Sequence, residues 1–133
     1  MYKDNLKRQH KEIRASLEAI LCLIGQNNIS DKALELAREI SSLSGKLKVH
    51  LIFEDNFLYP DLDKRNNKLK EIGQAYKKEM QDIGHKFMEY KDNYNTRGKI
   101  VAKAEAFVKD TIKIFELLKE RLDKEDRELY PYL

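Results

Sequence analysis

The sequence predicts an all-α protein, an up-down-up-down antiparallel four-helix bundle. The 133 residues include only two prolines and five glycines, which leaves long stretches without helix breakers. Apolar residues recur at spacings of three or four in four segments that short polar stretches separate. Short loops between long amphipathic helices favour antiparallel neighbours. The length suits one hydrophobic core, so we expect a single domain over residues 1–133.

The first two helices are expected over about Asp4 to Gln26 and from an N-cap at Ser30 to about Pro60. The inward stripe of the first helix comprises Leu6, His10, Ile13, Leu17, Ile20 and Ile24. That of the second comprises Leu36, Ile40, Leu43, Leu47, His50, Glu54 and Phe57. The single cysteine, Cys22, lies in the apolar run AILCLI and is predicted to be a core thiol.

The last two helices are expected over about Arg65 to Tyr90 and from Gly98 or Lys99 onward, with a turn around NYNTRG. The third has an inward stripe of Leu69, Ile72, Tyr76, Glu79 or Met80, Ile83, Phe87 and Tyr90. The stripe of the fourth is Ile100, Ala104, Phe107, Thr111, Ile114, Leu118, Arg121 and Glu125.

Composition argues against several classes of protein. Charged residues form 37% of the chain, but both signs are interspersed and the net charge is only +3, which does not favour nucleic-acid binding. No apolar run approaches about 18 residues, so we expect no membrane span. The N-terminal residues lack a signal-peptide pattern, and a lone cysteine excludes an internal disulfide. We therefore expect a soluble cytoplasmic protein.

Five polar residues lie on stripes that otherwise hold Leu, Ile and Phe: His10, His50, Glu54, Arg121 and Glu125. Burying such groups without partners is costly. His10 stands about 16 residues before the end of its helix and His50 about 20 residues after the start of the next, so antiparallel packing brings both to one level. We expect the five groups to converge on one layer of the bundle.

Two of these residues begin a repeated segment. HLIFEDNFLYP starts at His50 and RLDKEDRELYP at Arg121, and the two share Leu, Glu, Asp, Leu, Tyr and Pro at identical offsets. The first position differs, with histidine in one segment and arginine in the other. The tyrosines of the two LYP sequences, Tyr59 and Tyr130, are expected to close the end of the bundle by packing, with a gating or redox role as the alternative.

The polar layer has two interpretations. His and Glu at i and i+4 lie on one helical face, so both can reach one ion, and their donor atoms suit iron, zinc or manganese. Alternatively, Arg121 neutralises Glu54 and Glu125 in a buried ionic network of a metal-free regulatory or interaction domain. No enzyme motif is recognisable: the Glu-x-x-His spacing of ferritin-like oxidases and a phosphate-binding loop are both absent.

The chain resembles the hemerythrin family, in its HHE cation-binding branch, through a lone His10, the segment HLIFEDNFLYP and the related KEDRELYP. The resemblance implies two irons bridged by carboxylates, with histidines in the other positions. By position, His10 and His50 match ligands of one iron, and Glu54 and Glu125 match the bridging carboxylates. Arg121 replaces the expected histidine, and a guanidinium has no lone pair for a metal. The site is therefore mononuclear or has a weakened second iron.

The third helix offers three candidates for a ligand or for a supporting residue. His85 has the right chemistry, but it lies about 15 Å beyond the level of His50 on a continuous helix. Tyr76 and Glu79 are closer in level, and are expected to be a core aromatic residue and a surface or supporting acid. The resemblance implies binding of oxygen or nitric oxide, redox sensing, or iron handling.

Overall fold

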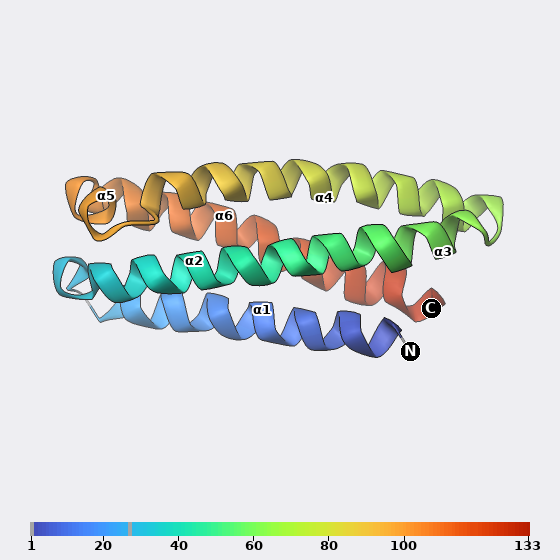
Figure 1. Cartoon of the computed structure of the whole chain (residues 1–133), viewed down its shortest axis with the longest axis horizontal. Helices are drawn as coiled ribbons and strands as arrows, with labels where there is room; N and C mark the ends of the chain where they lie inside the picture. The colour runs from blue at the N-terminus through green and yellow to red at the C-terminus, as the bar shows by residue number, and fades with distance from the viewer. Residues whose placement is uncertain (1, 27) are drawn as a thin grey trace.

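The computed structural model describes residues 2–26 and 28–133, and these are helical apart from short turns. The long helices are α1 (Tyr2–Gly25), α2 (Ile29–Phe53), α4 (Asn67–Tyr94) and α6 (Ala104–Lys124). The short ones are α3 (Tyr59–Asp63), α5 (Arg97–Ala102), the π-helical turns η1 (Glu54–Leu58) and η2 (Glu125–Leu129), and the 3-10 turn η3 (Tyr130–Tyr132). Figure 1 shows both termini at the end of the bundle that holds α3, with α5 at the other. The predicted antiparallel four-helix bundle is confirmed.

The apolar stripes of the four long helices meet in two clusters. The larger cluster includes Ile13, Leu47 and Leu122, and the smaller, at the α3 end, includes Leu6, Leu58 and Leu129. Buried polar residues lie along the chain between the residues of the larger cluster and those of the smaller one. They are His10 in α1, His50 in α2, Glu54 at the start of η1 and Glu125 at the start of η2. The predicted polar layer therefore lies between two apolar regions, where water is excluded. Within the described residues, no helix is long and apolar enough to cross a membrane.

The N-cap of α2 differs from the one predicted from the sequence. The Asn28 side chain, rather than that of Ser30, caps α2 by accepting a hydrogen bond from the Asp31 amide at 3.4 Å. Asparagine and serine are both favourable N-caps, and the helix starts early enough for Ser30 to lie inside its first turn. Asn66 caps α4 through the Leu69 amide at 2.9 Å.

The predicted stop at Pro60 is wrong, because the helical path continues through η1 into α3 and ends at Asp63. Pro60 sits in the first turn of α3, where a missing N–H is tolerated. The π-helical turn contains one more residue than an α-helical turn, which shifts the inward face. Leu58 is consequently buried, and Phe57, expected inward, is 49% exposed.

Two further expectations need correction. The fourth helix is not continuous: α5 and α6 are separated at Lys103, whose φ of −139° and ψ of 50° leave the helical range. Cys22 is exposed instead of buried, because it lies on the outer face of α1, two residues beyond buried Ile20.

Asp61 ties the start of α1 to α3 and gives a pH-dependent prediction. Tyr2 donates a hydrogen bond to it, Arg65 forms an ion pair with it at 2.9 Å, and together they lower its pKa. A depressed carboxyl pKa contributes stability above the unfolded-state value of about 3.9, and that stability is lost as the pH falls through the folded-state pKa. Asp61→Asn is expected to cost under about 1 kcal/mol at pH 7, because the group is partly exposed. Chemical denaturation at pH 7 and at pH 3 measures the free energy of unfolding of variant and parent. The difference between the two free energies should shrink at pH 3, and an unchanged difference would contradict the prediction.

Candidate metal centre

Four side chains from four elements of the fold meet in the polar layer. His10 comes from α1, His50 from the last turn of α2, and Glu54 and Glu125 from the first positions of η1 and η2. One ligand atom from each lies within 4.8 Å of the other three, and all four residues are fully buried. The structure thus brings together the four residues that the sequence predicted as ligands.

The distances between these atoms suit donors that share one ion. His10 Nε2 lies 3.2 Å from His50 Nε2 and 3.0 Å from Glu125 Oε1. His50 Nε2 lies 3.5 Å from Glu54 Oε1 and 3.7 Å from Glu125 Oε1. Donors bound at about 2.1 Å to one ion are separated by about 3.0 Å at a right angle and about 3.4 Å at a tetrahedral angle. The separations of 3.0 and 3.2 Å fall within this range, and those of 3.5 and 3.7 Å lie slightly above it.

Neighbouring side chains orient both imidazoles. Asp126 Oδ1 lies 2.9 Å from His10 Nδ1, and Gln9 Oε1 lies 2.8 Å from His50 Nδ1. Arg14 holds the other oxygen of Asp126 at 2.5 Å. Because both partners are acceptors, each imidazole donates from Nδ1, and in its neutral form presents the lone pair of Nε2 to the cluster. Metal-binding histidines are commonly oriented in this way.

The electrostatics of the cluster favour a cation. Burial and the neighbouring Glu125 raise the pKa of Glu54 well above its usual range, and burial lowers the pKa of His50. Burial also opposes ionisation of Glu125, but hydrogen bonding to His10 and His50 outweighs it and lowers the pKa of that carboxyl. Two carboxylate oxygens, Glu54 Oε1 and Glu125 Oε2, are buried without a hydrogen-bond partner among the residues that the structure describes. An excess of inward acceptors of this kind costs free energy until a cation binds.

The residues therefore fit a divalent or trivalent metal ion. Two imidazole nitrogens and two carboxylates are a donor set that binds iron, zinc or manganese, and the first three donors also match the two-histidine, one-carboxylate set of non-haem iron sites. Such an ion would be held by His10, His50, Glu54 and Glu125. When bound, it would supply Lewis acidity and open coordination positions in an apolar core.

Tyr130 was predicted from the sequence mainly as a packing residue at the end of the bundle, and not as a neighbour of the metal ligands. Its hydroxyl lies 2.9 Å from His10 Nε2 and 3.1 Å from Glu54 Oε2. In a regular α-helix, Tyr130 would lie about 140° around the axis from Glu125. The π-helical turn η2, closed by the Tyr130 amide bonding to the Glu125 carbonyl, brings the two onto one face. The repeated EDxxLYP pattern was the available signal, because both copies form such a turn.

Arg121 does not form the ionic network considered from the sequence. Its guanidinium donates to Glu79 and, at 3.0 Å, to the carbonyl of Tyr76, and it stacks 4.1 Å from the centroid of the Tyr76 ring. Within residues 2–26 and 28–133, it has no ion pair with Glu54 or Glu125. Arg121 is 4% exposed, whereas the Glu79 side chain is 53% exposed. Positions 76 and 79 of α4 thus hold the arginine in place.

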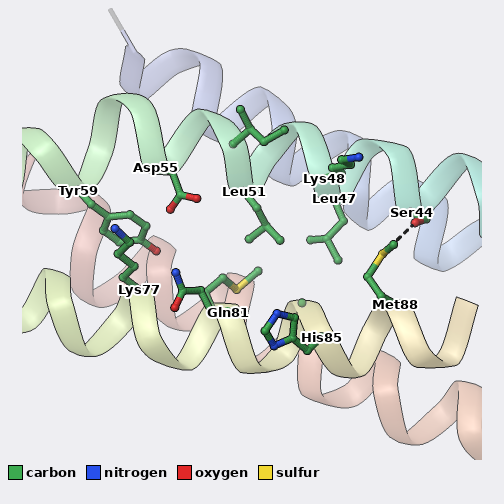
Figure 2. Close-up of a pocket in the computed structure, with 13 residues that line it drawn as sticks. Ser44, Leu47, Lys48, Leu51, Asp55, Tyr59, Lys77, Gln81, His85 and Met88 are labelled. Carbon is green, nitrogen blue, oxygen red and sulfur yellow. Dashed lines mark hydrogen bonds between the residues drawn. The ribbon is translucent and has the colours of Figure 1, made fainter.

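His85 lies in a groove between α2 and α4 and outside the four-residue cluster. Figure 2 shows its imidazole among Leu47, Leu51 and Gln81, with Tyr59 at the far end of the groove. The groove has a volume of about 240 Å³ and mainly apolar walls. Because α4 is continuous over Asn67–Tyr94, no break at Gly73 moves His85 toward the level of His50.

A helical bundle whose core holds two histidines and two glutamates belongs to the class of cation-binding four-helix proteins. The sequence matches the Hemerythrin HHE cation binding domain over residues 2–133. The chain therefore belongs to the hemerythrin HHE family, as the resemblance indicated. Comparison with curated proteins and with solved structures gave no match.

Proposed function

We propose that this protein binds a single non-haem iron ion on His10, His50, Glu54 and Glu125. The observation that carries the proposal is the convergence of two imidazole Nε2 atoms and two carboxylates in a fully buried layer, with their other nitrogens fixed by Asp126 and Gln9. Zinc and manganese are compatible with the same donors. Iron is proposed because the family resemblance and the donor set agree.

The environment of Arg121 supports one ion instead of two. In the repeated segments, Arg121 stands before Glu125 as His50 stands before Glu54. A guanidinium offers no lone pair, and its fixed positive charge disfavours a second cation nearby. Glu79 and the Tyr76 carbonyl satisfy this charge and keep it in the position where the family resemblance implies a second metal.

The complete burial of the four donor residues favours a small ligand over a large substrate. Since all four donors are fully buried, a large substrate would have to displace core side chains to reach an ion there. Oxygen and nitric oxide are small and apolar enough to pass through transient openings of a core. We therefore propose that the iron binds or senses a diatomic gas, with iron handling as the second role compatible with the same site.

Metal content and stability test this proposal. The metal-free protein is titrated with ferrous iron without oxygen, and bound iron is measured by elemental analysis. We expect about one iron per chain, and iron at 100 times its Kd should stabilise the fold by about 2.7 kcal/mol. A chelator should reverse the rise in Tm. Exposure to nitric oxide should then change the visible spectrum.

Two results would contradict the proposal. An unchanged Tm together with no retained iron would leave a metal-free helical domain as the better account. Retained iron without a spectral response to nitric oxide or oxygen would remove the gas-binding role and leave iron handling. Zinc, which has no redox chemistry, serves as the control for stabilisation by the ion alone.

A further inference from the structure

We infer that Tyr130 is a fifth ligand of the bound iron, through its phenolate oxygen. This inference rests on the proposed iron site and adds a protein donor to it. Tyr130 Oη lies 2.9 Å from His10 Nε2 and 3.1 Å from Glu54 Oε2. His10 Nε2 is one of the atoms that would bind the ion, and Glu54 Oε2 belongs to a carboxylate whose Oε1 faces His50, so the hydroxyl lies beside the donor cluster.

The separations identify Tyr130 as a donor by the same criterion as the other four residues. Ligand atoms at right angles around one ion, at bond lengths of about 2.1 Å, lie about 3.0 Å apart. The distances from Tyr130 Oη match this value as closely as the separation of 3.0 Å between His10 Nε2 and Glu125 Oε1. Oxygen of a tyrosinate is an established type of ligand for iron in proteins.

The surrounding structure holds the phenol in place. The Tyr130 ring stacks on the His10 imidazole, with centroids 4.9 Å apart and planes at 28°, and the residue is 1% exposed. The π-helical turn η2 gives Glu125 and Tyr130 their common face. Because π-helical turns are rare and are frequent at functional sites, a turn that aims Tyr130 at the donors is consistent with a ligand role.

Metal binding changes the hydrogen bonding of this hydroxyl. In the metal-free protein, it can donate to the His10 Nε2 lone pair or to Glu54 Oε2. An ion held by His10 Nε2 would remove that acceptor. Tyr130 would then bind as a phenolate whose proton has gone to solvent, since metal binding generally releases protons from its ligands.

The test uses the full chain loaded with ferrous iron and then oxidised in air. Ferric iron bound to a phenolate gives an intense charge-transfer band in the visible region, and resonance Raman excitation within that band enhances tyrosinate ring vibrations. We expect both signals in the parent protein. Tyr130→Phe should lose the band and weaken iron binding about 100-fold or more, while one iron still binds at saturating iron.

Tyr59 provides a matched control. It occupies the same position in the other copy of the repeated segment. Its hydroxyl is buried without a hydrogen-bond partner in the described part of the chain, and its ring lines the groove in Figure 2. Tyr59→Phe should keep the band. Loss of the band in Tyr59→Phe, or its persistence in Tyr130→Phe, would overturn the assignment.

If either variant fails to fold, the spectra and iron content of the parent protein still test whether Tyr130 is a ligand. One ferric ion per chain without tyrosinate vibrations would overturn the fifth ligand and leave the proposed iron site intact. Failure to bind iron at all would overturn both. The two failures are therefore distinguished by elemental analysis of the same sample.

Discussion

Replacing His50 with alanine is expected to abolish iron binding under conditions in which the parent protein is saturated. The imidazole is fully buried, its Nε2 is within 3.7 Å of donor atoms from His10, Glu54 and Glu125, and no other histidine lies close enough to replace it. Loss of an outer hydrogen-bond partner of a metal ligand typically costs about 10- to 100-fold in affinity, so loss of a ligand should cost at least about 100-fold. Titration calorimetry with zinc and elemental analysis after iron loading measure the effect.

His85→Ala is the matched control, because it removes an imidazole of the same size from the groove between α2 and α4. Its metal content and affinity should equal those of the parent. If His50→Ala binds iron with the parent stoichiometry and affinity, the four-residue site is wrong. If His85→Ala loses the ion, the metal lies elsewhere on the bundle.

Replacing Arg121 with histidine is expected to raise the metal content from about one to about two ions per chain at saturation. The change removes a fixed positive charge and supplies a nitrogen donor one turn before Glu125, as His50 does before Glu54. It also releases Glu79, whose carboxylate now pairs with the arginine. The buried Glu125 Oε2, which has no hydrogen-bond partner within residues 2–26 and 28–133, is then available to a second ion.

Arg121→Leu separates the two effects of this substitution. Leucine removes the charge without adding a donor, so its metal content should stay at the parent value. An equal rise in both variants would mean that charge alone excludes the second ion. An Arg121→His protein that still binds the parent amount would show that arginine is not what limits the site.

The helices and the four donor positions could be predicted from the sequence because they depend on local periodicity. On straight helices, residues three or four apart share a face, so His10, His50, Glu54 and Glu125 were expected on inward stripes at one level. The same rule failed where the helices are not regular. Phe57 was expected inward, but η1 has one extra residue per turn and places Leu58 there instead.

The sequence by itself determined the class of fold, the donor types and the replacement of a histidine by Arg121. Only the tertiary structure decided which groups complete the centre. Tyr130 faces the donors because η2 changes the helical register, and Asp126 and Gln9 fix the imidazoles across helix boundaries. Likewise, Arg121 bonds to Glu79 in preference to the buried glutamates. Contacts of this kind join residues up to 120 positions apart, so a local pattern could indicate the turn before Tyr130 but not the partners of its hydroxyl.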